Sequence, residues 1–230
     1  MMKSYTYLLI DLACIAVPLL ASFYPKHAFF KHWKSFFIAN SIVTLVFLIW
    51  DYFFTDMGVW GFNPEYLLGI YIANLPLEEI LFFICIPFSC VFSYFAFKYL
   101  VSATFFKGIQ QYITLGCSVV FISLGLIHYS KWYTFTAFLF AGMYLLYLRW
   151  KQVDLSYHYL AYVFILPFFL ISNGLLTGSF LEAPIVWYNN AENLGLRIFT
   201  IPIEDSVYGM LLIFMNIEGF RYFQSKALKI

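Results

Sequence analysis

Two short acidic motifs stand out among the residues of this chain that could do chemistry. One is Pro-Leu-Glu-Glu at residues 76–79, and the other is Pro-Ile-Glu-Asp at residues 202–205, 126 residues further on. Each motif opens a long apolar segment. Acidic side chains inside membrane-like sequence are costly and usually mark function. We therefore take the four acids as the candidate catalytic residues: Glu78, Glu79, Glu204 and Asp205.

Such pairs can supply both a proton donor and a proton acceptor. Burial disfavours the charged form of a carboxyl group, and of two neighbouring carboxyls one tends to stay protonated. Adjacent helical residues point about 100° apart, so one acid of each pair can face a central cavity. Aromatic faces stabilise cations, and the chain has 29 Phe and 19 Tyr. This combination matches acid-initiated rearrangement of an alkene through a carbocation, and we expect Glu79 or Glu204 to donate the proton.

The same motifs also fit a purely structural role at the start of a helix. Asn74 and Thr200 are suitable N-cap residues, and acids in a first turn complement the helix dipole. However, residues 67–75 are already apolar, so the first motif need not lie at the membrane surface. No cationic residue is near either motif except Arg197. We therefore favour the functional interpretation.

The composition is that of an integral membrane protein. Hydrophobic residues make up 63% of the 230 residues and charged residues 11%, against roughly 25% in soluble domains. The net charge of +1 and the lack of a basic patch exclude a nucleic-acid-binding protein. A helix needs about 20 residues to cross a bilayer. We predict an all-α fold with about seven transmembrane helices, near residues 5–23, 35–54, 75–97, 111–128, 132–149, 158–177 and 200–218.

The distribution of Lys and Arg predicts how the chain is oriented. Only Lys3, Lys131 and Arg197 lie on one side of the predicted bundle. Cationic residues gather on the cytoplasmic side, so we expect a bacterial-type cytoplasmic membrane with the N-terminus outside and the C-terminus in the cytoplasm. The other ten basic residues lie on the opposite side: Lys26, Lys31, Lys34, Lys98, Lys107, Arg149, Lys151, Arg221, Lys226 and Lys229.

The chain contains an internal repeat. A shift of 126 residues lays the first, second and third predicted spans on the fifth, sixth and seventh. We predict one membrane domain, 1–230, with parallel three-helix repeats at about 1–100 and 129–226 and a linking helix at about 111–128. Identical residues at this shift include Asn63 and Asn189, Leu68 and Leu194, Gly69 and Gly195, Ile72 and Ile198, Pro76 and Pro202, and Glu78 and Glu204.

Two long loops precede the acidic motifs, at residues 55–74 and 178–199, and both are rich in Gly, Asn and aromatic residues. Their tryptophans, Trp60 and Trp187, either anchor the chain at the membrane interface or fold inward over a cavity. We expect these loops and the nearby helix starts to supply the substrate-binding side chains Trp60, Asn63, Tyr71, Asn74, Trp187, Asn189 and Tyr208.

Several familiar site types have no counterpart in the sequence. No Gly-rich dinucleotide or flavin motif follows a strand, and aspartate-rich magnesium motifs are missing. The four histidines (27, 32, 128 and 158) lie near span ends without helical pairing, which favours interfacial residues over metal ligands. We expect Asp11, alone in the first span, to make an interhelical hydrogen bond. The sequence therefore predicts no cofactor and no metal.

The two motifs and their Trp- and Asn-containing loops resemble the heterodimer-type, non-flavin lycopene cyclases. In that family Pro-x-Glu-Glu/Asp occurs once in each of two small subunits or twice in a fused chain, and this sequence resembles the fused form. The resemblance implies a cofactor-free isomerase of carotenoid biosynthesis, a lycopene β-cyclase. It would convert the ψ-ends of lycopene to β-ionone rings, giving γ-carotene and then β-carotene. The implied partners are lycopene or another linear carotenoid, the lipid bilayer and other carotenoid enzymes.

Other functions remain open at the level of sequence. A carotenoid hydratase would form the same cation and trap it with water. A small proton-coupled transporter would also use parallel repeats and intramembrane acids, although the spans lack a polar stripe. A retinal photoreceptor is disfavoured, because residues 201–218 contain no lysine for a Schiff base. The sequence leaves the ring type and the number of cyclised ends undecided.

Overall fold

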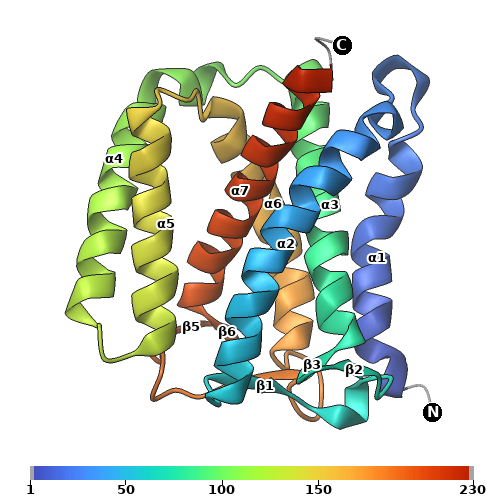
Figure 1. Cartoon of the computed structure of the whole chain (residues 1–230), viewed down its shortest axis with the longest axis vertical. Helices are drawn as coiled ribbons and strands as arrows, with labels where there is room; N and C mark the ends of the chain where they lie inside the picture. Colours follow the sequence, from blue (N-terminus) through green and yellow to red (C-terminus); the bar gives the residue numbers. More distant parts are fainter. Residues whose placement is uncertain (1–2, 228–230) are drawn as a thin grey trace.

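The computed structural model describes residues 3–227 and consists mainly of seven long helices (Figure 1). They are α1 (Thr6–Ala21), α2 (Trp33–Asp56), α3 (Leu77–Leu100), α4 (Thr104–Ile127), α5 (Trp132–Trp150), α6 (Ser156–Leu176) and α7 (Ile203–Ala227). Each predicted span corresponds to one of these helices, so the all-α class is confirmed. Lys229, counted above among the basic residues, lies outside the described residues.

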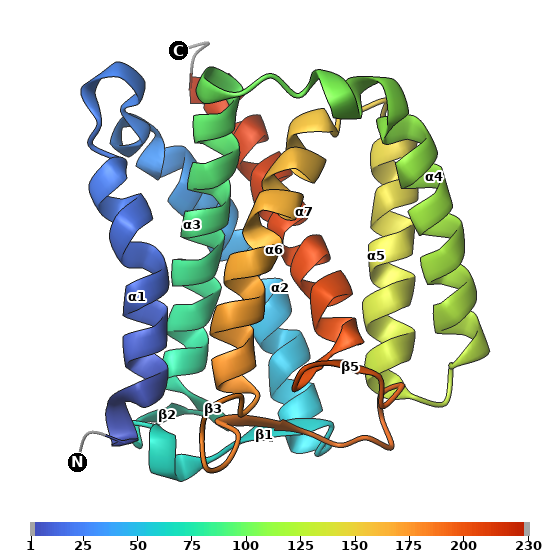
Figure 2. The same ribbon diagram turned by 180° about the vertical axis from the view of Figure 1, so that it is seen from behind.

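Five helices are long and apolar enough to cross a membrane, namely α1, α2, α3, α4 and α6. The other two, α5 and α7, do not meet that measure although they run alongside the rest (Figures 1 and 2). In α7 the sequence is less apolar because the helix carries three acidic residues together with Arg221 and Lys226. Many of its side chains are buried among other helices rather than facing outward, including both acids of its first turn.

The two halves of the chain interlock. Within each half, the first helix packs on the third, as α1 on α3 and α5 on α7. Across the halves, the second helix of each packs on the third helix of the other, as α2 on α7 and α6 on α3. Equivalent helices of the two halves run in the same direction, and α4 packs along α5 at one edge (Figure 2). This arrangement is that of parallel repeats related by an axis along the bundle.

Six very short strands lie together at the end of the bundle where α3 and α7 begin, which we call the strand end (Figure 1). Strand β1 (Trp60–Phe62) pairs antiparallel with β4 (Val186–Tyr188). Gly61 faces Trp187, its own equivalent at the 126-residue shift, so the repeat axis passes through this pair. Trp60 and Trp187 are therefore not equivalent residues of the two halves, because at this shift Trp60 corresponds to Val186.

Each half also forms a small hairpin just before its acidic motif. In the first half β2 (Tyr71–Ile72) pairs with β3 (Leu75–Pro76), and in the second half β5 (Arg197–Ile198) pairs with β6 (Ile201–Pro202). Short 3₁₀ turns complete the described chain: η1 (Lys3–Tyr5), η2 (Pro25–His27), η3 (Phe29–His32) and η4 (Pro64–Tyr66). The two hairpins occupy equivalent positions in the repeats, so they place the two acidic motifs in equivalent positions.

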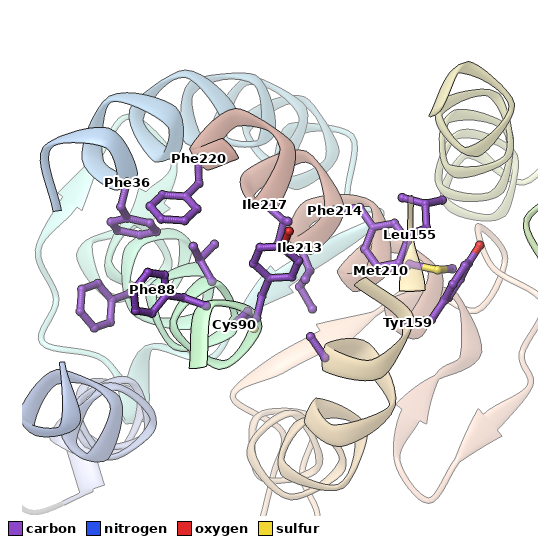
Figure 3. Packing of buried hydrophobic residues seen from close by; sticks show 14 of the residues in the cluster. Phe36, Phe88, Cys90, Leu155, Tyr159, Met210, Ile213, Phe214, Ile217 and Phe220 are labelled. Carbon is purple, nitrogen blue, oxygen red and sulfur yellow. The ribbon is translucent and has the colours of Figure 1, made fainter. Parts of the chain in front are cut away.

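Aromatic side chains fill the core towards the opposite end of the bundle. Phe36, Phe88 and Phe220 pack together there, and Phe214 lies beside Tyr159 (Figure 3). A polar contact crosses this apolar interior, because Asn40 Nδ2 donates to Asn216 Oδ1 at 3.1 Å and so links α2 to α7. The same nitrogen also donates to the carbonyl of a residue in α3. These contacts hold the two halves in register.

Two local expectations are wrong. Neither Asn74 nor Thr200 acts as an N-cap: α3 is preceded by Pro76 without a side-chain cap, and the Asn74 amide donates to the Tyr52 carbonyl. The Thr200 hydroxyl instead bonds to hydroxyls in the preceding loop. His158 is not interfacial but fully buried, and its Nε2 lies 2.8 Å from Glu218 Oε1. This contact joins α6 to α7, and the spacing of residues in the sequence does not predict which side chain of α7 lies next to His158.

Candidate active site

One acid of each motif bonds to a tyrosine from the first helix of its own half. Tyr7 Oη donates to Glu79 Oε2 at 2.5 Å, and Tyr133 Oη donates to Asp205 Oδ1 at 2.6 Å. The two tyrosines are themselves equivalent at the 126-residue shift. All four side chains are buried, and the two carboxyls are close enough to interact electrostatically. The strand end therefore brings the two halves' acids to one centre.

The surroundings of these two acids differ. Asp205 Oδ2 accepts two further hydrogen bonds, from Asn173 Nδ2 at 2.7 Å and from Tyr188 Oη at 3.0 Å. The positions equivalent to Asn173 and Tyr188 are Phe47 and Phe62, which have no polar side chain. Three donors stabilise a negative charge on Asp205, whereas Glu79 has a single donor among the described contacts. The pair is thus suited to unequal roles.

The other acid of each motif holds the loop that precedes it. Glu78 Oε1 accepts from the backbone N–H of Leu68 at 2.6 Å, and Glu204 Oε1 accepts from Leu194 N–H at 2.7 Å. Glu204 has an additional donor, the Thr134 hydroxyl at 2.6 Å. Both acids are completely buried. Their bonds fix the loops against α3 and α7, which positions the hairpins and the neighbouring acids.

Four aromatic rings surround the central acids. Trp60 packs edge-on against Tyr133 with centroids 5.0 Å apart, and Tyr133 stacks on Tyr188 at 5.8 Å. Tyr208 lies 6.2 Å from both Trp60 and Tyr133. The faces of such rings attract positive charge. Buried acids together with aromatic faces are the groups that could protonate a substrate and stabilise a cation.

A third carboxyl group belongs to this centre. Asp51 of α2 is buried, and its Oδ1 accepts from the indole Nε1 of Trp60 at 2.5 Å. Its charge interacts with Glu79 and with Tyr208. The other oxygen, Oδ2, is buried without a hydrogen-bond partner among the described residues. At the equivalent position the second half has Thr177, so this acid occurs once in the site.

A comparison with known protein families gives one match that covers most of the chain. The lycopene cyclase family model matches residues 4–97 and again residues 130–223. The chain belongs to the lycopene cyclase family. Its two matches are offset by the same shift that relates the acidic motifs, and the chain is therefore the fused two-repeat form. No curated protein and no solved structure matches the chain in the corresponding searches.

The substrate-binding residues expected from the sequence lie in three different settings. Trp60 and Tyr208 are at the centre, and Trp60 is only 6% exposed. Asn63 and Asn189 hold the paired strands: the N–H of each donates to a carbonyl of the other half. The remaining three lie away from the centre: Asn74, which bonds to α2, and Tyr71 and Trp187, which are exposed.

Sequence reasoning missed several residues of the candidate site. Tyr7 and Tyr133 are an identical pair at the repeat shift, and that identity was a signal that could have found them. Asn173 and Tyr188 have no equivalent in the first half, so neither the repeat nor the motif marked them. Asp51 lies near the end of the second predicted span and belongs to neither acidic motif. Its role depends on a contact with Trp60, which no sequence pattern indicates.

The remaining expectations about charged groups can be compared with the structure. Asp11 is completely buried, but both of its oxygens lack a hydrogen-bond partner among the described residues, so the expected interhelical bond is wrong. Arg197 donates to Thr200 and Asn190 in its own loop rather than to either acidic motif. Within residues 3–227, no group of three or more His, Cys, Asp or Glu side chains is placed to hold a metal ion.

Proposed function

We propose that this member of the lycopene cyclase family is a lycopene β-cyclase, a redox-neutral isomerase that uses the central acids for proton-initiated ring closure. The observation that carries the proposal is the convergence of Glu79 and Asp205, from equivalent positions of two repeats, on one buried and aromatic-lined centre. The substrate would be lycopene or another linear carotenoid, taken from the bilayer.

In the proposed reaction, the Glu79 carboxyl gives its proton to C2 of the terminal C1=C2 double bond. The resulting cation at C1 is attacked by the C5=C6 double bond, which closes the ring and leaves the positive charge at C5. Loss of a proton from C6 restores the C5=C6 double bond of a β-ring. Atoms and electrons balance without an oxidant or reductant. Asp205, with three donors, supplies fixed negative charge to the cationic stages.

The asymmetry of the centre supports one reaction site per chain rather than two. Only the second half supplies the donors around Asp205, and only the first half supplies Asp51. The two ends of lycopene would then react in turn, with γ-carotene as the intermediate and β-carotene as the end product. The charge distribution further supports an N-terminus outside and a C-terminus in the cytoplasm. In that orientation the site would lie near the outer leaflet.

The test is pigment analysis in lycopene-producing cells that express the chain or its variants. Wild type should convert lycopene to cyclic products of unchanged mass. Glu79→Gln and Asp205→Asn should lower that conversion by about 100-fold or more, since a positioned acid or base contributes ~10²–10⁴. Both amide variants retaining full activity at normal protein levels would overturn the acid–base assignment. A product heavier by one water would instead identify a hydratase.

A further inference from the structure

The proposed roles of Glu79 as proton donor and Asp205 as fixed anion leave one step without an assigned residue. That step is the loss of the proton from C6. Asp205 is a poor acceptor for it, because three donors already engage its two oxygens. Glu78 and Glu204 each use one oxygen to hold a loop, and their other oxygens, like both oxygens of Asp11, are buried without a partner among the described residues. None of these three acids has a described hydrogen bond to an aromatic side chain of the centre, so we look for the base in a carboxylate that has both a free oxygen and such a bond.

We infer that Asp51 is the catalytic base that removes the C6 proton, an inference that rests on the proposed cyclase function. Its Oδ1 is fixed by the Trp60 indole at 2.5 Å, and this bond leaves Oδ2 as the free oxygen. Oδ2 is buried and has no partner among residues 3–227, although an unpaired buried acceptor carries a free-energy cost. A substrate C–H positioned there would complete the contact.

The position of Asp51 relative to the other acids supports this assignment. Trp60, which it holds, packs against Tyr133 and Tyr208, and Tyr133 bonds to Asp205. Asp51 is also close enough to Glu79 for their charges to interact. The donor and the acceptor therefore lie at one centre but on different helices, α3 and α2. Two carboxyls on different elements can face different carbons of one substrate.

The proposed step closes the proton balance. The Asp51 carboxylate takes H⁺ from C6, and the C6–H electron pair forms the C5=C6 double bond of the ring. Asp51 is then protonated and Glu79 is ionised, the reverse of their starting states. Transfer of one proton from Asp51 back to Glu79 restores the site. No exchange with bulk water is required over a complete turnover, which suits a site buried in apolar surroundings.

Asp51→Asn is a discriminating variant. The asparagine Oδ1 can still accept the Trp60 N–H, so the ring stays in place while the basic oxygen is lost. Asp56→Asn is the matched control, because Asp56 is an exposed acid at the end of the same helix. Trp60→Phe makes the opposite change, because it removes the indole N–H and leaves the Asp51 carboxylate. If Asp51 only positions Trp60, Trp60→Phe should lose more cyclisation activity than Asp51→Asn.

The experiment uses the full chain in liposomes containing lycopene, in D₂O buffer, with cyclic product and deuterium in the recovered lycopene measured together. We expect Asp51→Asn to slow cyclisation by about 100-fold or more, as for loss of a general base. Deuterium should still enter recovered lycopene, because Glu79 continues to protonate C2 reversibly. Asp51→Glu, which retains a carboxyl group, should recover part of the activity, and Asp56→Asn should match wild type.

Three results would overturn the inference. The first is a wild-type rate of cyclisation in Asp51→Asn. The second is that Asp51→Asn loses deuterium uptake as well as cyclisation. The third is that Asp51→Glu is as inactive as Asp51→Asn. Thermal unfolding of each purified variant shows whether it is folded, and if the Asn protein is not, the Glu variant alone decides. Failure of wild type to make cyclic product of unchanged mass would instead refute the proposed function itself.

Discussion

At the scale of single residues, the two acidic motifs are alike in sequence but divided in role. The first acid of each motif bonds to a backbone N–H ten residues earlier, and this bond is repeated closely in the two halves. The second acid of each motif faces the centre, where Asp205 has two donors that Glu79 lacks. The two halves therefore share the bonds that hold the loops, and they differ at the centre, where we propose that Glu79 donates a proton and Asp205 remains an anion.

This division predicts different tolerance within one motif. Glu78→Gln keeps a carbonyl oxygen that can accept the Leu68 N–H, so we expect activity within about 10-fold of wild type. Glu79→Gln removes the acidic proton and should cost about 100-fold or more. Glu78→Ala leaves a buried N–H unpaired, at roughly 1–3 kcal/mol of stability. Cyclic product per unit of purified protein, with the unfolding temperature, separates these cases. Equal losses in both Gln variants would refute the division.

The tyrosine partners should differ in importance as well. Tyr7 is the single described donor to Glu79, and its bond becomes charge-assisted once the acid has given up its proton. Tyr7→Phe should therefore slow turnover by about 10- to 100-fold. Tyr133→Phe should cost less, because Asp205 keeps Asn173 and Tyr188. Initial rates in liposomes measure both, with Tyr112→Phe, 78% exposed on α4, as the control. A larger loss for Tyr133→Phe would contradict this order.

At the scale of elements, the strand pair β1–β4 is the point where the halves meet around the repeat axis. Gly61 lies opposite Trp187, and a Cβ at Gly61 would come within 2.4 Å of the indole ring. Only glycine fits beneath the ring at this position. The pairing also sets the direction of Trp60, the neighbour of Gly61, towards Asp51 and the central tyrosines. A small strand contact thus determines where a site residue lies.

We predict that Gly61→Ala destabilises the protein by about 1–3 kcal/mol and lowers activity, because the added methyl group displaces the Trp187 ring or the strand. Adding Trp187→Ala should restore stability relative to Trp187→Ala alone, since the colliding ring is gone. Unfolding in detergent and cyclisation rates are the measurements. Gly116→Ala, in open space on α4, is the control. Additive effects of the two changes would show that the contact is unimportant.

At the scale of the whole molecule, the sequence predicted the elements well and the centre only in part. Each helix follows an apolar run long enough to span a bilayer, and such runs are visible without any partner. The repeat could be predicted because identical residues recur at one fixed shift. By contrast, Asn173 and His158 bond from α6 to acids of α7, and Asp51 of α2 bonds to Trp60 of the strand β1. Those contacts depend on how helices pack, which neither hydropathy nor spacing records.

The interlocked packing of the halves leads to a prediction for the divided chain. Helix α2 packs on α7 and α3 packs on α6, so each half loses large helix contacts when the other is absent. A break at residues 101–103, between α3 and α4, leaves α4 with the second half, where it packs on α5. We expect neither fragment alone to cyclise lycopene and co-expression of both to restore activity, measured as ring-containing pigment in lycopene-producing cells.

As a control, an uncut chain with a protease site inserted at residues 101–103 should behave as wild type. Cyclisation by either fragment alone would mean that one acid and its own half suffice, which the shared centre of Glu79, Asp205 and Asp51 argues against.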